Sequence, residues 1–339
     1  MRSCWPAFCD VARMTRKVQD AVVVITGASS GIGRATARAF AARRARVVLA
    51  ARREAALDDV ARECERAGGR ALVVPTDVTE LEAVEHLASR AVDAFGRIDV
   101  WVNNAAVAVF GRFEDTPYDA FRRVIDVNLL GYVHGARAAL PRLRRAGGGV
   151  LINNASILAR LTQPYMSAYV MSKHAIQALS DCLRQELVGS GIEVCTALPA
   201  AIDTPLWQHS ANYTGHVVEP PPPVYPPERV ARTIVSLAER PRRVAYAGNA
   251  GRVLSWQHLL APGLSERVIG AVMDRVTIRD DQAPVSDGNI FMPLADGHGA
   301  GGGWSEGASL LRAMRRLANR VLRGDQPREG EPTRLATGR

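Results

Sequence analysis

Apolar and polar positions follow a repeating pattern between about residues 21 and 247: short apolar runs rich in β-branched residues alternate with longer segments of helical spacing. Runs such as "VVVITG" and "RVVLAA" lack polar alternation, which is typical of strands buried on both faces of a parallel sheet. Strands separated by helix-length connections predict a doubly wound α/β fold, with helices on both faces of a seven-stranded parallel sheet. The predicted strands are Ala21–Thr26, Arg46–Ala50, Arg70–Val74, Val100–Asn103, Gly149–Asn153, Glu193–Leu198 and Arg243–Ala247.

Changes in this pattern predict how the chain is divided. We expect a disordered leader over residues 1–19, one α/β domain over 20–250 with a lid at about 203–228, and a helical C-terminal extension over 251–339. Within the α/β domain the predicted helices include Gly31–Arg43, Glu54–Ala67 and Glu80–Phe95.

The C-terminal extension should contain a helix around Ser265–Val276, a Gly-rich linker at Gly297–Gly303, a helix at about 309–322 and a disordered tail. The helix at 309–322 carries one apolar stripe flanked by arginines, which makes it strongly amphipathic. Such a helix suits docking on the body of the protein, on a partner subunit or on an anionic membrane surface, and the sequence leaves these alternatives open.

Composition and charge narrow the class of protein. The 339 residues are 47% hydrophobic and 23% charged, as in soluble globular proteins. No stretch approaches the roughly 18 consecutive apolar residues of a transmembrane helix. The net charge is +9, but the arginines are spread along the chain without a nucleic-acid-binding motif, so we expect no nucleic-acid partner. Five scattered cysteines without metal-like spacing indicate reduced thiols and a cytoplasmic location. We expect no metal site, and we interpret His209 and His216 as solvated side chains because neither has a partner at the spacing of metal ligands.

A Gly-rich loop follows the first predicted strand. The stretch "VVVITGASSGIGRATARAF" places Gly27, Gly31 and Gly33 between that strand and the first predicted helix. Glycines there allow a tight turn and close approach of the backbone to a pyrophosphate, which then rests on the helix N-terminus. Because the loop has a strand before it and a helix after it, it indicates a dinucleotide-binding site.

The end of the second predicted strand indicates which dinucleotide is preferred. Dehydrogenases that use NAD usually carry an acid here for the ribose 2′-hydroxyl, whereas this chain has Ala51 followed by Arg52 and Arg53. Two guanidinium groups suit a 2′-phosphate by charge and by their forked geometry. The sequence therefore predicts a preference for NADP(H) over NAD(H).

The stretch "YMSAYVMSKHA" contains a candidate acid/base pair. Of the 43 basic residues only Lys17 and Lys173 are lysine, and Lys173 follows Tyr169 by four residues, so both would share one helix face. Ser156 comes just after the predicted strand Gly149–Asn153, at the sheet edge where doubly wound folds bind ligands.

In combination these motifs closely resemble the short-chain dehydrogenase/reductase family, classical type, over about residues 20–250. The motifs are, in order, Gly27-x3-Gly31-x-Gly33, Asn103-Asn104-Ala105, Asn128, Ser156 and Tyr169-x3-Lys173. The resemblance implies a Rossmann fold and an oxidoreductase that interconverts a carbonyl and an alcohol by hydride transfer with NADP(H).

The resemblance also implies roles for four catalytic residues. Tyr169 is the expected general acid/base, and Lys173 is expected to lower the pKa of its phenol and to hold the nicotinamide ribose. Ser156 would orient and polarise the carbonyl, and Asn128 would hold a water molecule of the proton relay.

Further residues match the family's binding positions. The cofactor-binding residues that the resemblance and the loop pattern imply are Gly27, Ser29, Ser30, Gly31, Ile32, Gly33, Arg52, Arg53, Asp77, Val78, Asn104, Ala105, Tyr169, Lys173, Pro199, Ile202 and Thr204. The candidate substrate residues are Ile157, Leu206 and Trp207, which indicate an apolar substrate. The sequence departs from the family pattern at Ala106 and Ala200, where glycine is usual, and at Ala155, where serine is frequent.

A second reading of the same fold is a catalytically silent NADP-binding scaffold or regulator. The complete set of Asn128, Ser156, Tyr169 and Lys173 favours the enzyme, because a silent protein has no chemical need for all four. The family resemblance further implies a homodimer or a homotetramer, and the C-terminal helix makes peripheral membrane contact a further expectation.

Overall fold

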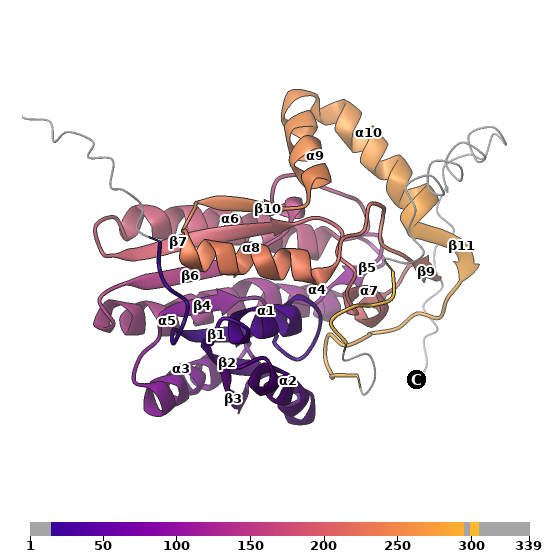
Figure 1. The fold of residues 1–339 in the computed structure, drawn as a ribbon. Coiled ribbons are helices and arrows are strands. Elements are labelled where there is room, and N and C mark those ends of the chain that lie inside the picture. Colours follow the sequence, from indigo (N-terminus) through magenta and orange to yellow (C-terminus); the bar gives the residue numbers. More distant parts are fainter. Residues whose placement is uncertain (1–14, 295–298, 305–339) are drawn as a thin grey trace, which may run out of the picture.

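Seven parallel strands form the central sheet of the computed structural model, which describes residues 15–294 and 299–304 (Figure 1). The sheet has the order β10-β7-β6-β4-β1-β2-β3. Its strands are β1 (Val22–Thr26), β2 (Arg46–Ala51), β3 (Arg70–Pro75), β4 (Val100–Asn103), β6 (Gly149–Asn154), β7 (Ile192–Pro199) and β10 (Val244–Ala247). The doubly wound parallel sheet predicted from the sequence is confirmed.

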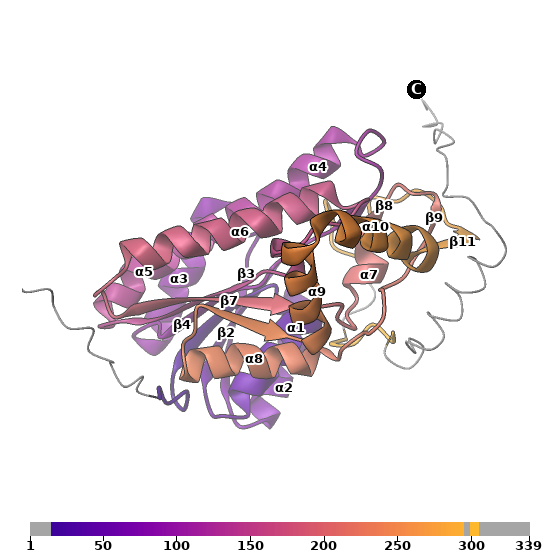
Figure 2. The ribbon, with the colours of Figure 1, turned by 90° about the horizontal axis from the view of Figure 1, so that it is seen from above.

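Both faces of the sheet are covered by helices (Figures 1 and 2). Along β1, Val22 and Val24 pack into one core cluster, whereas Val23 and Ile25 pack into the cluster on the opposite face. All residues of this strand are therefore buried, which explains the absence of polar alternation. One face carries α1 (Gly31–Ala41), α2 (Glu54–Arg66) and α8 (Pro227–Glu239), and the other carries α3 (Leu81–Phe95), α5 (Gly131–Arg145) and α6 (Ser167–Glu186).

The strand order reverses between β1 and β4. Strand β1 pairs with β2 on one side and with β4 on the other, and the chain reaches β4 only after running outward to β3. The connections above the carboxyl ends of β1 and β4 therefore separate and leave a crevice, the usual ligand position of doubly wound folds.

Irregular segments surround this edge of the sheet. Helix α4 (Tyr118–Ile125) continues through a π-helical turn at Asp126–Leu130 into α5. The segment after β7 contains α7 (Leu206–His209), β8 (Ala211–Asn212), which pairs with β5 (Val109–Phe110), and β9 (His216–Val218), which pairs with β11 (Ile278–Gln282).

Two helices that follow the sheet form a hairpin. They are α9 (Asn249–Leu260) and α10 (Pro262–Val272), and a π-helical turn at Met273–Thr277 leads from α10 into β11. The predicted helix around Ser265–Val276 corresponds to α10 and this turn, whereas α9 was not predicted. Its apolar side chains do not form a buried stripe, and Gly251 is its one fully buried residue.

Some expectations fall outside the described residues, namely the amphipathic helix at 309–322 and most of the leader. Of the expected leader, residues 15–19 are described, and they lie against the body: the Arg16 amide donates to the Glu239 carbonyl and Val18 is buried. Over the described ranges, no helix is both long enough and apolar enough to cross a bilayer.

Candidate active site

A cavity of about 440 Å³ opens at the carboxyl edge of the sheet, where the strand order reverses. It extends from the loop after β1, past Ser156 and Tyr169, to the inner side of α9 and α10. Every site residue predicted from the sequence lines this cavity except Gly33 and Asn128. The structure thus brings the cofactor, catalytic and substrate candidates together in one continuous space.

The Gly-rich loop is packed tightly against its neighbours. Gly27 has a φ of +65°, and a Cβ at this position would lie 2.7 Å from the Cα of Ala105. A Cβ on Gly33, in the first turns of α1, would lie 2.1 Å from the Gly27 carbonyl oxygen. Gly33 therefore acts by allowing α1 to approach the loop closely, which explains why it does not itself reach the cavity.

Asn104 joins the ends of β1 and β4. Its side-chain amide donates to the carbonyl oxygens of Thr26, at 2.9 Å, and Gly27, at 3.2 Å. Its Oδ1 accepts a hydrogen bond from Nδ2 of Asn154 at 2.9 Å. The "NNA" motif after β4 thus holds the phosphate loop and the end of β6 in register, in addition to lining the cavity.

Tyr169 and Lys173 lie one turn apart on α6, and both line the cavity. Lys173 is 1% exposed; its Nζ donates to the Asn154 carbonyl at 3.4 Å and lies 5.2 Å from the centre of the Tyr169 ring. The Tyr169 phenol is hydrogen-bonded with the hydroxyl of Ser156, whose oxygen also accepts the amide of Leu158 at 3.1 Å. Ser156 and Lys173 are buried and Tyr169 is half-buried, and all three line the cavity as one polar group.

Burial dominates the protonation of this pair. It lowers the pKa of Lys173 to about 7 and raises the pKa of Tyr169 to about 12, while the hydrogen bond with Ser156 acts in the opposite direction on Tyr169. We predicted that the ammonium would lower the tyrosine pKa, and this is not what the structure gives. The physical reason is that burial disfavours the charged phenolate, and this effect outweighs the hydrogen bond with Ser156.

Asn128 does not reach the cavity. Its side chain is fully buried in the π-helical turn, where Oδ1 accepts the Val107 amide at 2.8 Å and Nδ2 donates to the Val107 carbonyl at 2.9 Å. Nδ2 also contacts the Ser172 hydroxyl at 3.3 Å. This side chain therefore positions the loop that follows β4, and the expected role of Asn128 in holding a water molecule of the proton relay stays a prediction.

Comparison with known proteins identifies the family. A family model described as short chain dehydrogenase matches residues 21–214.

The chain belongs to the short-chain dehydrogenase/reductase family.

Two relatives extend beyond the matched range of this family model. The uncharacterized oxidoreductase YxnA of Bacillus subtilis is 38% identical over 266 residues, which cover 76% of this chain and 74% of that protein. Dehydrogenase/reductase SDR family member 7B of Bos taurus is 35% identical over 270 residues, or 76% of this chain and 83% of that protein. These likenesses identify an oxidoreductase of the short-chain dehydrogenase/reductase family.

Solved structures with the same fold hold both kinds of nicotinamide cofactor. An alcohol dehydrogenase from Thermococcus sibiricus, complexed with 5-hydroxy-NADP, matches with a TM-score of 0.59 and 31% identity, covering 67% of this chain and 94% of that one. A family member from Burkholderia phymatum in complex with NAD matches with a TM-score of 0.65 and 27% identity, covering 74% and 97%. The cofactor preference of this chain therefore has to be argued from its own residues.

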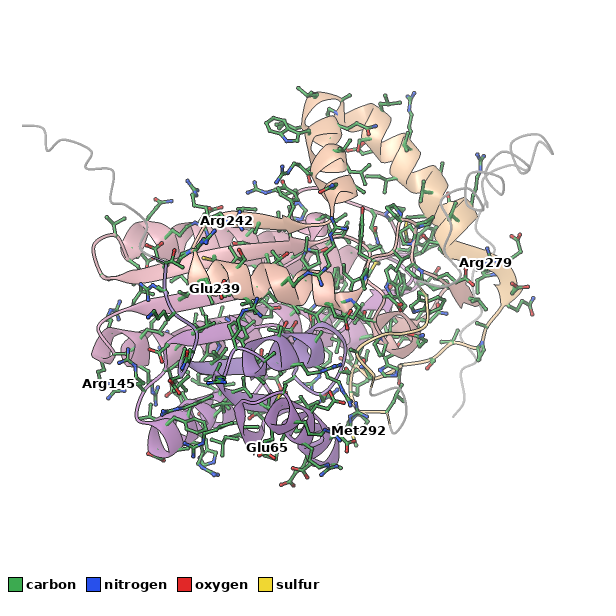
Figure 3. The ribbon with its side chains drawn as sticks, viewed as in Figure 1. Glu65, Arg145, Glu239, Arg242, Arg279 and Met292 are labelled. Atoms are coloured by element: carbon green, nitrogen blue, oxygen red, sulfur yellow. The ribbon has the colours of Figure 1, made fainter. Side chains whose placement is uncertain are left out.

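The C-terminal extension of the chain returns to the part of the cavity that the predicted cofactor residues line, which we call the cofactor half. We call residues 287–294 and 299–304 the return segment; Met292 marks its course past the end of α2 in Figure 3. Arg52 donates to the carbonyl oxygens of Asn289 and Phe291, both at 2.8 Å, and Arg53 donates to that of Leu294 at 2.5 Å. The two guanidinium groups predicted to bind a 2′-phosphate thus also bind the protein's own backbone.

The return segment also reaches the phosphate loop. The Gly31 amide, at the N-terminus of α1, donates to the Gly299 carbonyl at 3.0 Å. Asp203 Oδ1 accepts the amides of Gly302, at 2.8 Å, and Trp304, at 2.9 Å, which fixes this part of the segment beside Thr204. The two partners of each contact lie more than 90 residues apart in the chain. Each contact involves a backbone amide or carbonyl of the return segment, which any residue type provides, so no sequence motif indicated these contacts.

The substrate half of the cavity is apolar. Leu206 and Trp207, which we predict to contact the substrate, line it, and the Trp207 ring stacks on Phe110 with ring centres 5.7 Å apart. Sequence reasoning missed Phe110 and the residues that line the cavity from the hairpin and the turn after it: Ala250, Gly251, Leu254, Val268, Ile269, Val272 and Met273. Their helical spacing was visible in the sequence, but nothing in the sequence indicated that the extension turns back over the site.

His209 also lines the cavity and is 8% exposed, so its interpretation as a solvated side chain was wrong.

Proposed function

We propose that this dehydrogenase is an NADP(H)-dependent oxidoreductase that interconverts a carbonyl and an alcohol on an apolar substrate. The observation that carries the proposal is the position of Tyr169. Its phenol, hydrogen-bonded with Ser156, lines the cavity between the dinucleotide-binding residues and an apolar half suited to a substrate.

The residues of the cofactor half fit a nicotinamide dinucleotide. Lys173 has three N–H donors and, among the described residues, the Asn154 carbonyl as their acceptor, so donors remain for ribose hydroxyls. Asn154 Oδ1 is buried and has no hydrogen-bond partner within the described ranges. A pyrophosphate at the phosphate loop would take over the Gly31 amide from Gly299, so the return segment has to shift locally when the cofactor binds.

We assign the parts of the cofactor to these residues. The pyrophosphate would be held by Gly27, Ser29, Ser30, Gly31 and Ile32, and the adenosine by Asp77 and Val78. The nicotinamide and its ribose would be held by Asn104, Ala105, Tyr169, Lys173, Pro199, Ile202 and Thr204, and all of these residues line the cavity. When bound, the cofactor supplies or accepts the hydride.

The preference for NADP(H) rests on Ala51, Arg52 and Arg53. No carboxylate occupies position 51, so the 2′-hydroxyl of NAD lacks the acid that usually binds it. A guanidinium carries five N–H donors, so the two carbonyl contacts of Arg52 leave donors for a 2′-phosphate. The phosphate would then join the backbone carbonyls of the return segment around the same arginine.

The catalytic chemistry follows from protonation states and hydrogen bonds. In reduction, Tyr169 gives its phenolic proton to the carbonyl oxygen while Ser156 donates a hydrogen bond to that oxygen. The raised pKa of Tyr169 keeps the phenol protonated at neutral pH, which is the form a general acid needs. Lys173 stabilises the phenolate that is left, and Asn128 holds the loop after β4 in place.

The substrate class follows from the side chains around the apolar half. Among the residues that the structure describes, no Asp, Glu, Lys or Arg lines the cavity between Phe110, Leu161, Leu206, Leu254 and Met273. A charged substrate would lose its hydration there without gaining a partner. We therefore propose an uncharged, apolar carbonyl or alcohol.

Assembly and location belong to the same proposal. Leu130 and Met171 are exposed apolar residues beside α5 and on α6, and we propose that they lie in the interface of a homodimer or homotetramer. Cys64 and Cys195 are buried thiols and Cys182 is an exposed one, and we propose a cytoplasmic location that keeps them reduced.

The test of the proposed function separates binding from catalysis. Titration with NADPH and NADH should give tighter NADPH binding, and turnover of apolar ketones and aldehydes should then be detectable. Tyr169→Phe should abolish turnover and leave NADPH binding within about twofold. Normal NADPH binding without turnover of any carbonyl or alcohol by the wild-type protein would favour the silent scaffold instead.

A further inference from the structure

The α9–α10 hairpin exposes an unusual amount of apolar surface. Its exposed side chains include Trp256 (59%), Leu259 (71%), Leu260 (80%) and Leu264 (59%), together with Val253 and Val268. Six large exposed apolar side chains gather on two adjacent helices or at their ends, whereas single exposed apolar residues are ordinary on a protein surface. We call these six residues the hairpin patch.

The hairpin projects from the α/β body. Figure 1 shows α9 rising beyond the end of β10 and α10 returning toward β11, with the connection between them farthest from the sheet. Leu259, Leu260 and Leu264 surround this connection, and the stretch 259–265 contains no charged residue. The outer end of the hairpin is therefore apolar, and side chains extend from the hairpin into solvent (Figure 3).

The inner side of the hairpin belongs to the substrate half of the cavity. Leu254, Ile269 and Met273 line the cavity from this side. Val268 belongs to both surfaces, because it lines the cavity and is 42% exposed. An apolar path therefore leads from the hairpin patch to the space beside Tyr169.

The charges of the hairpin suit an anionic surface. Arg252 and Arg267 are exposed on its two helices, and Glu266 is the one acidic residue between Asn249 and Val272. The whole chain carries a net charge of +9, which adds long-range attraction to a negative surface. A Trp and several Leu residues flanked by arginines are typical of segments that insert at the headgroup level of a bilayer.

From these observations we infer that the α9–α10 hairpin docks this dehydrogenase on an anionic phospholipid bilayer. The hairpin patch enters the headgroup and upper acyl region, and Arg252 and Arg267 contact lipid phosphates. The cavity then opens toward the bilayer along Val268, so an apolar substrate reaches Tyr169 without crossing water. Delivery of substrate rests on the proposed function, whereas docking does not.

Flotation of the full chain with phosphatidylcholine vesicles, with and without phosphatidylserine, tests the docking. We expect binding to the anionic vesicles and weaker binding to the neutral ones. Leu260→Asp should lower the partition coefficient at least about tenfold, because it removes a Leu that enters the bilayer and places a charge among the lipid headgroups. Val188→Asp is the matched control: Val188 is 83% exposed and follows α6, outside the hairpin, so this change should leave the partition coefficient within about twofold.

The fluorescence of Trp256 reports its position. Vesicles should shift the wild-type emission to shorter wavelength, brominated lipids should quench it, and Trp256→Phe should lose both responses.

Two results would overturn the proposal, one showing that a second copy of the chain covers the hairpin patch and one showing that another segment contacts the bilayer. If a second copy covers the patch, Leu260→Asp changes the molar mass in solution and the wild-type protein does not float. If removal of residues 305–339 abolishes flotation while Leu260→Asp leaves it intact, the extreme C-terminus makes the contact instead. Failure of docking is also separable from failure of the proposed function, because Leu260→Asp should turn over a water-soluble carbonyl normally and Tyr169→Phe should still float.

Discussion

Replacing Lys173 by methionine should stabilise the cofactor-free protein while abolishing its activity. The ammonium is 1% exposed and has one hydrogen-bond acceptor among the described residues, at the long distance of 3.4 Å. Burial lowers its pKa from 10.5 to about 7. Methionine keeps most of the length of the lysine side chain but carries no charge, so the penalty for burying the charge disappears.

The size of the stabilisation by Lys173→Met follows from the pKa values of Lys173 in the unfolded and folded states. The pKa of Lys173 is 10.5 in the unfolded chain and about 7 in the folded protein. Each unit of this difference corresponds to about 1.36 kcal/mol, so below pH 7 the buried ammonium lowers the free energy of unfolding by about 5 kcal/mol. Loss of the contacts with the Tyr169 and Tyr132 rings and with the Asn154 carbonyl offsets part of this, so we expect a net gain of about 3 kcal/mol at pH 6.5.

The same pKa values predict that the stability of the wild-type protein increases with pH. Between pH 7 and 10.5 the unfolded chain holds a proton that folded Lys173 has lost, so the stability of the wild-type protein rises with pH by about 1.4 kcal/mol per unit. Lys173→Met lacks this contribution, so its advantage should shrink between pH 7 and 9. Ionisation of Tyr169 lies above this window, because its pKa is raised to about 12.

Urea denaturation of both proteins at several pH values between 6.5 and 9 measures this difference. Lys17→Met is the matched control, because Lys17 is exposed and is the other lysine of the chain; it should change stability by less than about 0.5 kcal/mol. Parallel pH curves for wild type and Lys173→Met, or a variant less stable than wild type at pH 6.5, would refute the reasoning.

Three further predictions concern the phosphate loop, the arginine pair and Tyr169. Gly33→Ala should destabilise the protein by about 2 kcal/mol in thermal unfolding, because its Cβ would lie 2.1 Å from the Gly27 carbonyl oxygen, whereas Gly270→Ala in α10, with open space around it, should gain up to about 1 kcal/mol. Arg52→Ala combined with Arg53→Ala should weaken NADPH binding at least about tenfold more than NADH binding in a fluorescence titration; equal weakening of both would contradict the 2′-phosphate assignment. Alcohol oxidation should accelerate between pH 7 and 9, because it needs the phenolate of Tyr169, whose pKa is about 12, while reduction stays flat over the same range; an oxidation rate that falls with pH would contradict this role.

Local spacing was enough to predict the sheet and the centre of the site. Buried parallel strands have apolar runs of a characteristic length, and residues four apart on a helix share a face, so the seven strands and the Tyr169–Lys173 pair could be predicted without any knowledge of the rest of the chain. The same holds for the phosphate loop, because a strand, a Gly-rich turn and a helix follow each other directly in the sequence.

Protonation and the precise place of each side chain depended on tertiary structure. The direction of the Tyr169 pKa depends on how much solvent its burial excludes, and the sequence does not contain that quantity. Asn128 matches the family's position, but its amide pairs with the backbone of Val107, so its side chain does not line the cavity.

The sequence by itself determined the fold, the family resemblance and the residues that meet at the carboxyl edge of the sheet. Only the tertiary structure decided that the chain beyond β10 turns back over that edge, where Arg52 binds carbonyl oxygens 237 and 239 residues away and α9 and α10 close the apolar half of the cavity. The physical reason is that helices and strands arise from short-range periodicity, whereas contacts to backbone carbonyls are made by any residue type and have no local pattern.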